Sequence, residues 1–195
     1  MKNTKSMIST IYQTLHAADL QELEGIYKKW ASDYDHDVVE LAGYVGHLIT
    51  SSLLLSKIKN KKAKILDAGC GTGLVGEILF ENNYKNVEGV DFSEEMLSVA
   101  NQKNIYQSLR LVDLTKKLDY EDNSFDAIVC AGTFTCGHVG PEALKEMLRV
   151  TKKAGYICFT VRKQEWEASP YKEIIDKLEN SNLWHQVVHK TTEYN

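Results

Sequence analysis

The amino-acid sequence predicts an α/β fold: a Rossmann-like, doubly wound and mostly parallel sheet with an N-terminal helical cap. Two observations support this prediction. From residue 61 onward, short β-branched runs alternate with helical patterns, and the first run ends in a glycine-rich segment from Asp67 to Gly73. Strands that alternate with helices form βαβ units, which build parallel sheets covered by helices on both faces.

The first part of the chain is predicted to be helical throughout. Residues 1–60 are expected to form a cap on the same domain as the core, residues 61–195, because no Ser/Gly/Pro-rich linker separates them. Asp19 and Glu22 have the spacing of a capping box before apolar residues at helical intervals. Helices are expected at residues 7–16, 20–30 and 37–57.

The core is predicted from its alternating runs. Strands are expected at residues 63–68, 87–91, 109–113, 127–131 and 155–161, with a last strand-like run at residues 186–192. Helices are expected at residues 74–82, 94–103, 141–151 and 171–180. Ligands of open α/β sheets bind outside the carboxyl ends of the strands. The residues that follow each strand are therefore the candidates for a site.

Charge and composition argue against several classes of partner. The formal net charge is −4, with 23 basic and 27 acidic residues, whereas broad binding to nucleic acid requires a clustered basic surface. The longest apolar candidate for a membrane span, residues 38–58, is interrupted by Glu40, His47 and Lys57. The four cysteines form no C-x-x-C pair, so free thiols and a cytoplasmic location are expected. Neither nucleic acid nor membrane is an expected partner.

The glycine-rich segment is the first candidate for a ligand site. Glycines at alternate positions allow a tight turn and a close approach of the backbone to a ligand at a helix start. Their spacing also fits the pyrophosphate of a dinucleotide, since Gly71, Gly73 and Gly76 complete that pattern. Asp67 favours a different ligand, because a carboxylate beside the loop repels a diphosphate and attracts a cation. S-adenosylmethionine carries both a sulfonium and an ammonium group.

Two further carboxylates follow predicted strands. Asp91 ends the second strand, where a carboxylate can accept both ribose hydroxyls. Asp113 ends the third strand and can accept from an adenine amino group. Between them, Phe92 and Met96 flank the start of a helix for which Ser93 is a good N-cap. Phe92 and Met96 are therefore expected on the two faces of an adenine ring.

These motifs together resemble a known family. The segments 67–73, 89–93 and 112–114 are similar to those of the class I S-adenosylmethionine-dependent methyltransferases. Residues 132–141, with 30–35 upstream and 159–162 downstream, are similar to the methyltransferase-like proteins named after the Williams–Beuren region. The resemblance covers nearly the whole chain, from about Tyr27 onward.

The resemblance implies a role for each matching residue. The methionine part of S-adenosylmethionine would be held by Asp67, Ala68, Gly69, Cys70, Gly71 and Gly73, and the ribose by Asp91. The adenine would be held by Phe92, Met96, Asp113 and Leu114, and the sulfonium would be flanked by Ala131, Gly132 and Thr133. The aromatic residues Tyr27, Trp30 and Tyr34 would close over the cofactor.

Methyl transfer needs little from the protein beyond alignment of the reactants and exclusion of water. A general base is needed only when the acceptor must lose a proton, and His138 is the candidate. We expect His138→Ala to lower turnover by roughly 100-fold with cofactor affinity unchanged. The residues expected to face the acceptor are Tyr34, Tyr44, Phe134, His138, Arg162 and Trp166. No metal is expected.

The acidic balance and the aromatic cap favour a small-molecule acceptor. Two alternatives remain at this stage: an NAD-dependent oxidoreductase, and a protein that binds S-adenosylmethionine without catalysis. The family's sheet normally ends in an antiparallel strand pair, yet only residues 186–192 have a strand-like pattern after the last helix. We therefore expect the C-terminal strand pair to be incomplete, with an exposed sheet edge through which a homo-oligomer can form.

Overall fold

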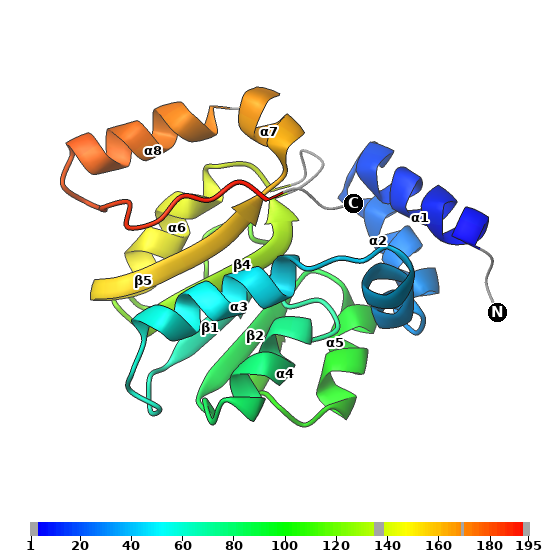
Figure 1. Ribbon diagram of the computed structural model, residues 1–195, viewed down its shortest axis with the longest axis horizontal. Coiled ribbons are helices and arrows are strands. Elements are labelled where there is room, and N and C mark those ends of the chain that lie inside the picture. The colour runs from blue at the N-terminus through cyan, green and yellow to red at the C-terminus, as the bar shows by residue number, and fades with distance from the viewer. Residues whose placement is uncertain (1–3, 135–138, 169, 193–195) are drawn as a thin grey trace.

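A computed structural model describes residues 4–134, 139–168 and 170–192. Its sheet has the strand order β3-β2-β1-β4-β5, and every pairing is parallel. The strands are β1 (Ile65–Ala68), β2 (Val87–Asp91), β3 (Ser108–Leu111), β4 (Phe125–Phe134) and β5 (Thr151–Val161). The order reverses beside β1, as in a doubly wound sheet (Figure 1). The predicted α/β fold is confirmed.

Helices bury apolar side chains against both faces of this sheet. They are α3 (Gly46–Lys57), α4 (Leu74–Glu81), α5 (Glu94–Gln102), α6 (Ala143–Val150) and α8 (Tyr171–Asn180). On one face, Leu54 of α3 and Leu79 of α4 pack with Ile65. On the other face, Met147 of α6 and Ile175 of α8 pack with Ile128. Because both faces are covered, the central strands carry apolar residues at nearly every position.

The N-terminal helices lie beyond the carboxyl ends of the strands (Figure 1). They are α1 (Thr4–His16), α2 (Leu20–Trp30) and the short π-helix η1 (His36–Leu41). The Asp19 carboxylate caps α2 by accepting from the Glu22 backbone N–H at 2.8 Å, as its spacing predicts. The expected single helix over residues 37–57 is wrong, because η1 and α3 are separate. Gly43, at φ +68°, turns the chain between them.

The chain after α8 differs from its sequence pattern. The strand expected at residues 186–192 is wrong: this segment runs beside β5 without regular structure (Figure 1). The Trp184 ring, just before it, packs against Phe159 of β5 with centroids 6.0 Å apart. A short helix, α7 (Lys163–Ala168), was not expected. Among the described residues β5 is an edge of the sheet, and association through that edge stays a prediction.

Candidate functional site

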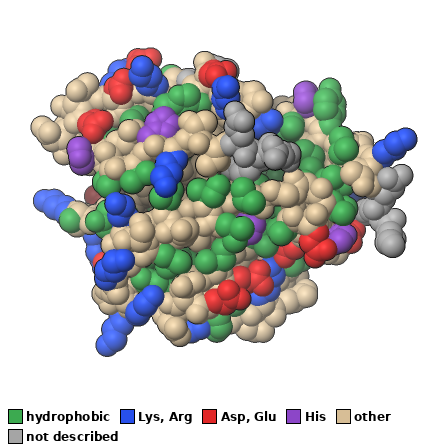
Figure 2. Space-filling model, viewed as in Figure 1, with side chains coloured by type: hydrophobic (Ala, Val, Ile, Leu, Met, Phe, Trp, Pro, Cys, Tyr) green, Lys and Arg blue, Asp and Glu red, His purple; other side chains and the backbone are tan. Residues whose placement is uncertain are grey.

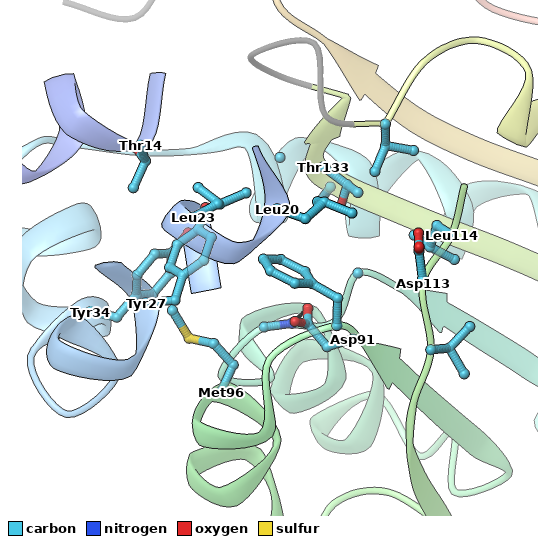
Figure 3. Close-up of a pocket in the computed structure, with 17 residues that line it drawn as sticks. Thr14, Leu20, Leu23, Tyr27, Tyr34, Asp91, Met96, Asp113, Leu114 and Thr133 are labelled. Atoms are coloured by element: carbon cyan, nitrogen blue, oxygen red, sulfur yellow. Dashed lines mark hydrogen bonds between the residues drawn. The ribbon is translucent and has the colours of Figure 1, made fainter. Parts of the chain in front are cut away.

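A cavity lies between the carboxyl ends of the strands and the N-terminal helices (Figure 3). The space inside it that a water molecule can occupy is about 90 Å³, and the cavity is partly open to solvent. Of the residues predicted to bind a cofactor, those that line it are Tyr27, Tyr34, Gly69, Gly71, Asp91, Phe92, Met96, Asp113, Leu114, Ala131, Gly132 and Thr133. The structure therefore brings the ends of β1, β2 and β4 and the loop after β3 to one place.

The glycine-rich loop passes from β1 into α4. Gly69, Gly71 and Gly73 all have positive φ angles, of +74°, +52° and +96°, which glycine adopts without strain. Gly69 is also crowded, because a Cβ atom there would collide with the Thr133 side chain. The loop thus turns sharply beneath the cavity.

Asp91 holds this loop to the end of β2. Its carboxylate accepts from the Gly71 backbone N–H at 2.8 Å and from the Ser93 backbone N–H at 3.0 Å. The residue is only 6% exposed, and burial raises the pKa of its carboxyl group while these N–H donors oppose the rise. Asp91 is therefore a preorganised acceptor at the rim of the cavity.

The side chains after β2 and β3 lie across the cavity from one another. Figure 3 shows Tyr27, Tyr34 and Met96 on one side and Asp113 on the other, with Asp91 between them. Met96 lies in the first turn of α5, which Ser93 caps by accepting from the Met96 backbone N–H at 3.3 Å. The cavity is therefore lined mostly by apolar and aromatic side chains, with carboxylates among them, a combination suited to a nucleoside.

Aromatic residues of the N-terminal part of the chain pack together beside the cavity. The Tyr27 ring contacts Phe92 edge-on, with centroids 5.8 Å apart, and Trp30 contacts Tyr34 at 4.8 Å. Trp30 is 3% exposed and its indole N–H donates to the buried Asp37 carboxylate at 2.8 Å. Trp30 therefore supports Tyr34 from behind and does not itself line the cavity.

An ion-pair network joins the cap to the core. Asp35, just before η1, accepts hydrogen bonds from the Thr72 hydroxyl of the glycine-rich loop and from the Lys103 ammonium, the latter at 2.7 Å. Lys103 also donates to Glu77 of α4 at 2.8 Å. The Lys103 side chain is only 17% exposed, so these contacts are weakly screened by solvent. The cap is thereby held against the loop.

Comparison with known proteins gives the family. A family model described as a methyltransferase domain matches residues 66–159. The human methyltransferase-like protein 27 is 34% identical over 177 residues, which cover 87% of this chain and 71% of that protein. The chain belongs to the class I S-adenosylmethionine-dependent methyltransferases.

One further relative agrees with this assignment, and a solved structure shares the fold. A ubiquinone/menaquinone biosynthesis C-methyltransferase of Bdellovibrio bacteriovorus is 33% identical over 151 residues, covering 73% of this methyltransferase and 62% of that protein. A crystal structure of a TehB-like methyltransferase from Corynebacterium glutamicum has the same fold, with a TM-score of 0.59 at 24% identity over 76% of this chain and 82% of that one. The methyltransferase uses S-adenosylmethionine, so an NAD-dependent oxidoreductase is not supported. The family assignment makes it an enzyme, so a non-catalytic binder is not supported either.

Asp67 occupies a different position from the one that its spacing suggests. It is 1% exposed and does not line the cavity. Its carboxylate accepts a hydrogen bond from the Tyr106 hydroxyl at 2.6 Å. Ala68, Cys70 and Gly73 are likewise part of the loop without lining the cavity. The Asp67 carboxylate of the methyltransferase thus lies beneath the glycine-rich loop.

The end of β4 forms the remaining wall. Ala131, Gly132 and Thr133 line the cavity, and the Gly132 backbone N–H donates to the Thr160 hydroxyl of β5 at 2.8 Å. A Cβ atom on Gly132 would lie 2.7 Å from the Tyr44 hydroxyl. Tyr44 therefore lies directly behind this wall of the methyltransferase, although it is not a lining residue.

Other residues expected to face the acceptor lie elsewhere. Phe134 is wholly buried, with its ring against Phe159 and Tyr171. Arg162 and Trp166 border a groove beside β5, and not the cavity. His138 lies outside the described residues. Of the expected acceptor residues that are described, Tyr34 alone lines the cavity.

Sequence reasoning missed the contribution of α1 and α2 to the cavity. Thr14, Leu20 and Leu23 line it from the cap side (Figure 3). The apolar periodicity of α2 indicated that one face of the helix is buried, but it did not identify what that face covers. Asp35, Tyr106 and Lys103 were missed as well, since no local motif marks them.

Two findings bear on the expected partners. No helix in the described parts of the methyltransferase is long and apolar enough to cross a membrane. On the face in Figure 2, Lys and Arg side chains are dispersed and do not gather around the cap.

Proposed function

We propose that this methyltransferase acts on a small-molecule acceptor that reaches the cavity beneath a cap formed by α1, α2 and η1. The expected cap of residues 1–60 also includes α3, but that helix packs on the sheet with the 61–195 core. The observation that carries the proposal is that Thr14, Leu20 and Leu23 cover the cavity from α1 and α2. A site covered by its own chain leaves little room for a macromolecular acceptor. The acidic net charge of −4 also disfavours nucleic acid.

The residues present fit S-adenosylmethionine. The proposed roles follow the geometry of the site: Asp91 accepts from the ribose hydroxyls, Phe92 and Met96 cover the adenine faces, and Asp113 with Leu114 borders the adenine edge. Gly69 and Gly71 line the cavity where the methionine part would lie, with the Asp67 carboxylate beneath them, and Ala131, Gly132 and Thr133 would flank the sulfonium. The preorganised Asp91 carboxylate supports this fit most directly, since bidentate acceptance by a carboxylate suits a pair of hydroxyl groups.

When bound, S-adenosylmethionine supplies an activated methyl group for in-line displacement by the acceptor. The work of the chain is to align the acceptor and to exclude water. The cap residues Leu20, Leu23 and Tyr27 present apolar surface to the cavity for this purpose. Among the described lining residues, the carboxylates are those of Asp91 and Asp113, and both are assigned to the nucleoside. The general base proposed from the sequence is His138, outside the described residues.

The test is a labelling experiment with methyl-tritiated S-adenosylmethionine in a cell lysate. Radioactivity is measured separately in the small-molecule, protein and nucleic-acid fractions. We expect the label in the small-molecule fraction with the wild type and its loss with Asp91→Asn, which removes the charge at the ribose position. Enzyme-dependent label confined to protein or nucleic acid would refute a small-molecule acceptor. Calorimetry with S-adenosylhomocysteine and with NAD tests the cofactor assignment independently.

A further inference from the structure

We propose that Tyr106 is a positioning residue of this methyltransferase, whose hydroxyl group holds the Asp67 carboxylate in the orientation and ionisation state that the cationic methionine part of the cofactor requires. This inference rests on the proposed role of the loop from Asp67 to Gly73. It adds a residue that no motif of the sequence singled out.

The hydrogen bond between these side chains is short and isolated. The Tyr106 hydroxyl donates to Asp67 Oδ2 at 2.6 Å, across 39 residues of sequence. Within the described parts of the chain it is the one hydrogen bond to the Asp67 carboxylate. Because an O–H group that donates to an ionised oxygen makes a strong and directional bond, Tyr106 determines how this buried carboxylate is oriented.

Glycines make room for the Tyr106 ring on three sides. A Cβ atom on Gly76 of α4 would collide with the ring and its hydroxyl group. A Cβ atom on Gly89 of β2 would lie 3.1 Å from ring Cε1, and one on Gly73 of the loop 3.2 Å from ring Cε2. Glycine is unfavourable inside helices and strands, so Gly76 is explained by the space that this ring occupies. At Gly89, Leu109 and Cys70 crowd an added Cβ atom even more closely than the ring does.

The Tyr106 hydroxyl group affects the pKa of the Asp67 carboxyl group. Tyr106 and Asp91 of β2 act on the pKa of Asp67. The Asp67 carboxylate in turn raises the pKa of the nearby Cys70 and Cys130 thiols. Burial raises the pKa of Asp67 to about 7, and Asp91 adds to the rise, whereas the Tyr106 hydrogen bond opposes it. Asp67 therefore titrates near neutral pH, and loss of the hydroxyl group moves its titration upward. A protonated Asp67 no longer attracts an ammonium group.

Tyr106→Phe tests this inference because it keeps the ring among the three glycines and removes only the hydroxyl group. The dissociation constant of S-adenosylhomocysteine is measured by calorimetry from pH 5.5 to pH 8.5. Wild-type binding should tighten as the pH rises through about 7. In the variant the midpoint should move upward by about one pH unit, so that binding weakens about 5-fold at pH 7 and up to about 10-fold at lower pH, while the two proteins approach one another at pH 8.5.

The matched control is Tyr84→Phe. The Tyr84 hydroxyl donates to the Ile58 carbonyl at 2.8 Å in the core, so its loss removes a buried hydroxyl group that does not contact Asp67. This control should reproduce the wild-type pH profile. In an Asp67→Asn background, Tyr106→Phe should cause no pH-dependent change, since the titrating group is gone.

Two results would overturn the inference. Weakening of binding by the same factor at every pH would mean that Tyr106 acts through packing alone, and an unchanged profile would mean that its hydroxyl group does not control Asp67. Failure of the proposed function gives a different result: wild-type protein that binds no S-adenosylhomocysteine at any pH would refute the cofactor site itself.

Discussion

Replacing Asp67 by Asn should stabilise the free protein at neutral and alkaline pH while weakening its affinity for the cofactor. Asp67 is 1% exposed, and burial raises the pKa of its carboxyl group from an ordinary value of 3.8 to about 7. Between these two values the unfolded chain has released the Asp67 proton while the folded protein still holds it. Each rise in pH over this range therefore favours the unfolded state.

The size of the effect follows from the two pKa values. One pKa unit corresponds to about 1.4 kcal/mol, so a rise of about three units amounts to about 4 kcal/mol of unfolding free energy lost between pH 4 and pH 8. Asn has nearly the same shape and its side-chain oxygen still accepts from the Tyr106 hydroxyl, but it does not ionise. The stability advantage of Asp67→Asn over the wild type should thus grow with pH by up to about 4 kcal/mol.

Urea unfolding of both proteins at a series of pH values between 4 and 8 measures this difference in unfolding free energy. The titration of all other groups is the same in both proteins and cancels. Asp126→Asn is the comparison of opposite sign, because a hydrogen bond from Lys152 lowers the pKa of the Asp126 carboxyl group. An Asp126 carboxylate stabilises the fold above its unfolded pKa, so Asn there should cost stability as the pH rises. A pH-independent difference between wild type and Asp67→Asn would refute the buried, titrating carboxylate.

Two further substitutions test the contacts around the loop. Lys103→Met removes the cation between Asp35 and Glu77, which should loosen the cap. Because a hydrogen bond to a charged group is worth about 1.5–3 kcal/mol, S-adenosylhomocysteine should dissociate about 10-fold faster in stopped-flow measurements. An unchanged rate would show that this network does not hold the cap. Gly76→Ala improves helix propensity but directs a Cβ atom into the Tyr106 ring. We therefore expect the free energy of unfolding, measured by thermal unfolding, to fall by about 1–3 kcal/mol. A gain in stability would contradict the crowding.

The sequence predicts those parts of the site that depend on local pattern. Asp91 and Asp113 were expected at strand ends because β-branched runs define the strands, and a parallel sheet brings such ends together at one edge. The loop glycines were expected because a tight turn with positive φ angles favours glycine. These inferences need only the chain order and the period of the apolar residues. Asp91 ends β2 as expected, whereas Asp113 lies two residues beyond the end of β3.

The contacts that hold the site in place could not be predicted. Asp67 and Tyr106 are 39 residues apart, and Asp35 and Lys103 are 68 apart. Neither pairing has a local signature, since the choice of partner depends on how loops of different length pack. The sequence places Asp67 just before the loop, but it does not reveal that the side chain is buried beneath the loop against Tyr106.

The segment at residues 186–192 shows why a strand pattern does not suffice for a strand. Its β-branched residues favour extended structure, yet Val187 and Val188 are 54% and 42% exposed, and the segment has no ladder of backbone hydrogen bonds in the described chain. β-propensity measures how well a side chain fits a paired and half-buried surface. A segment with high β-propensity therefore forms a strand only where it can pair with a neighbouring strand. The preceding Trp184 packs its ring on Phe159 of β5, which ties the chain to the face of the sheet. The run therefore lies beside an edge strand without extending it.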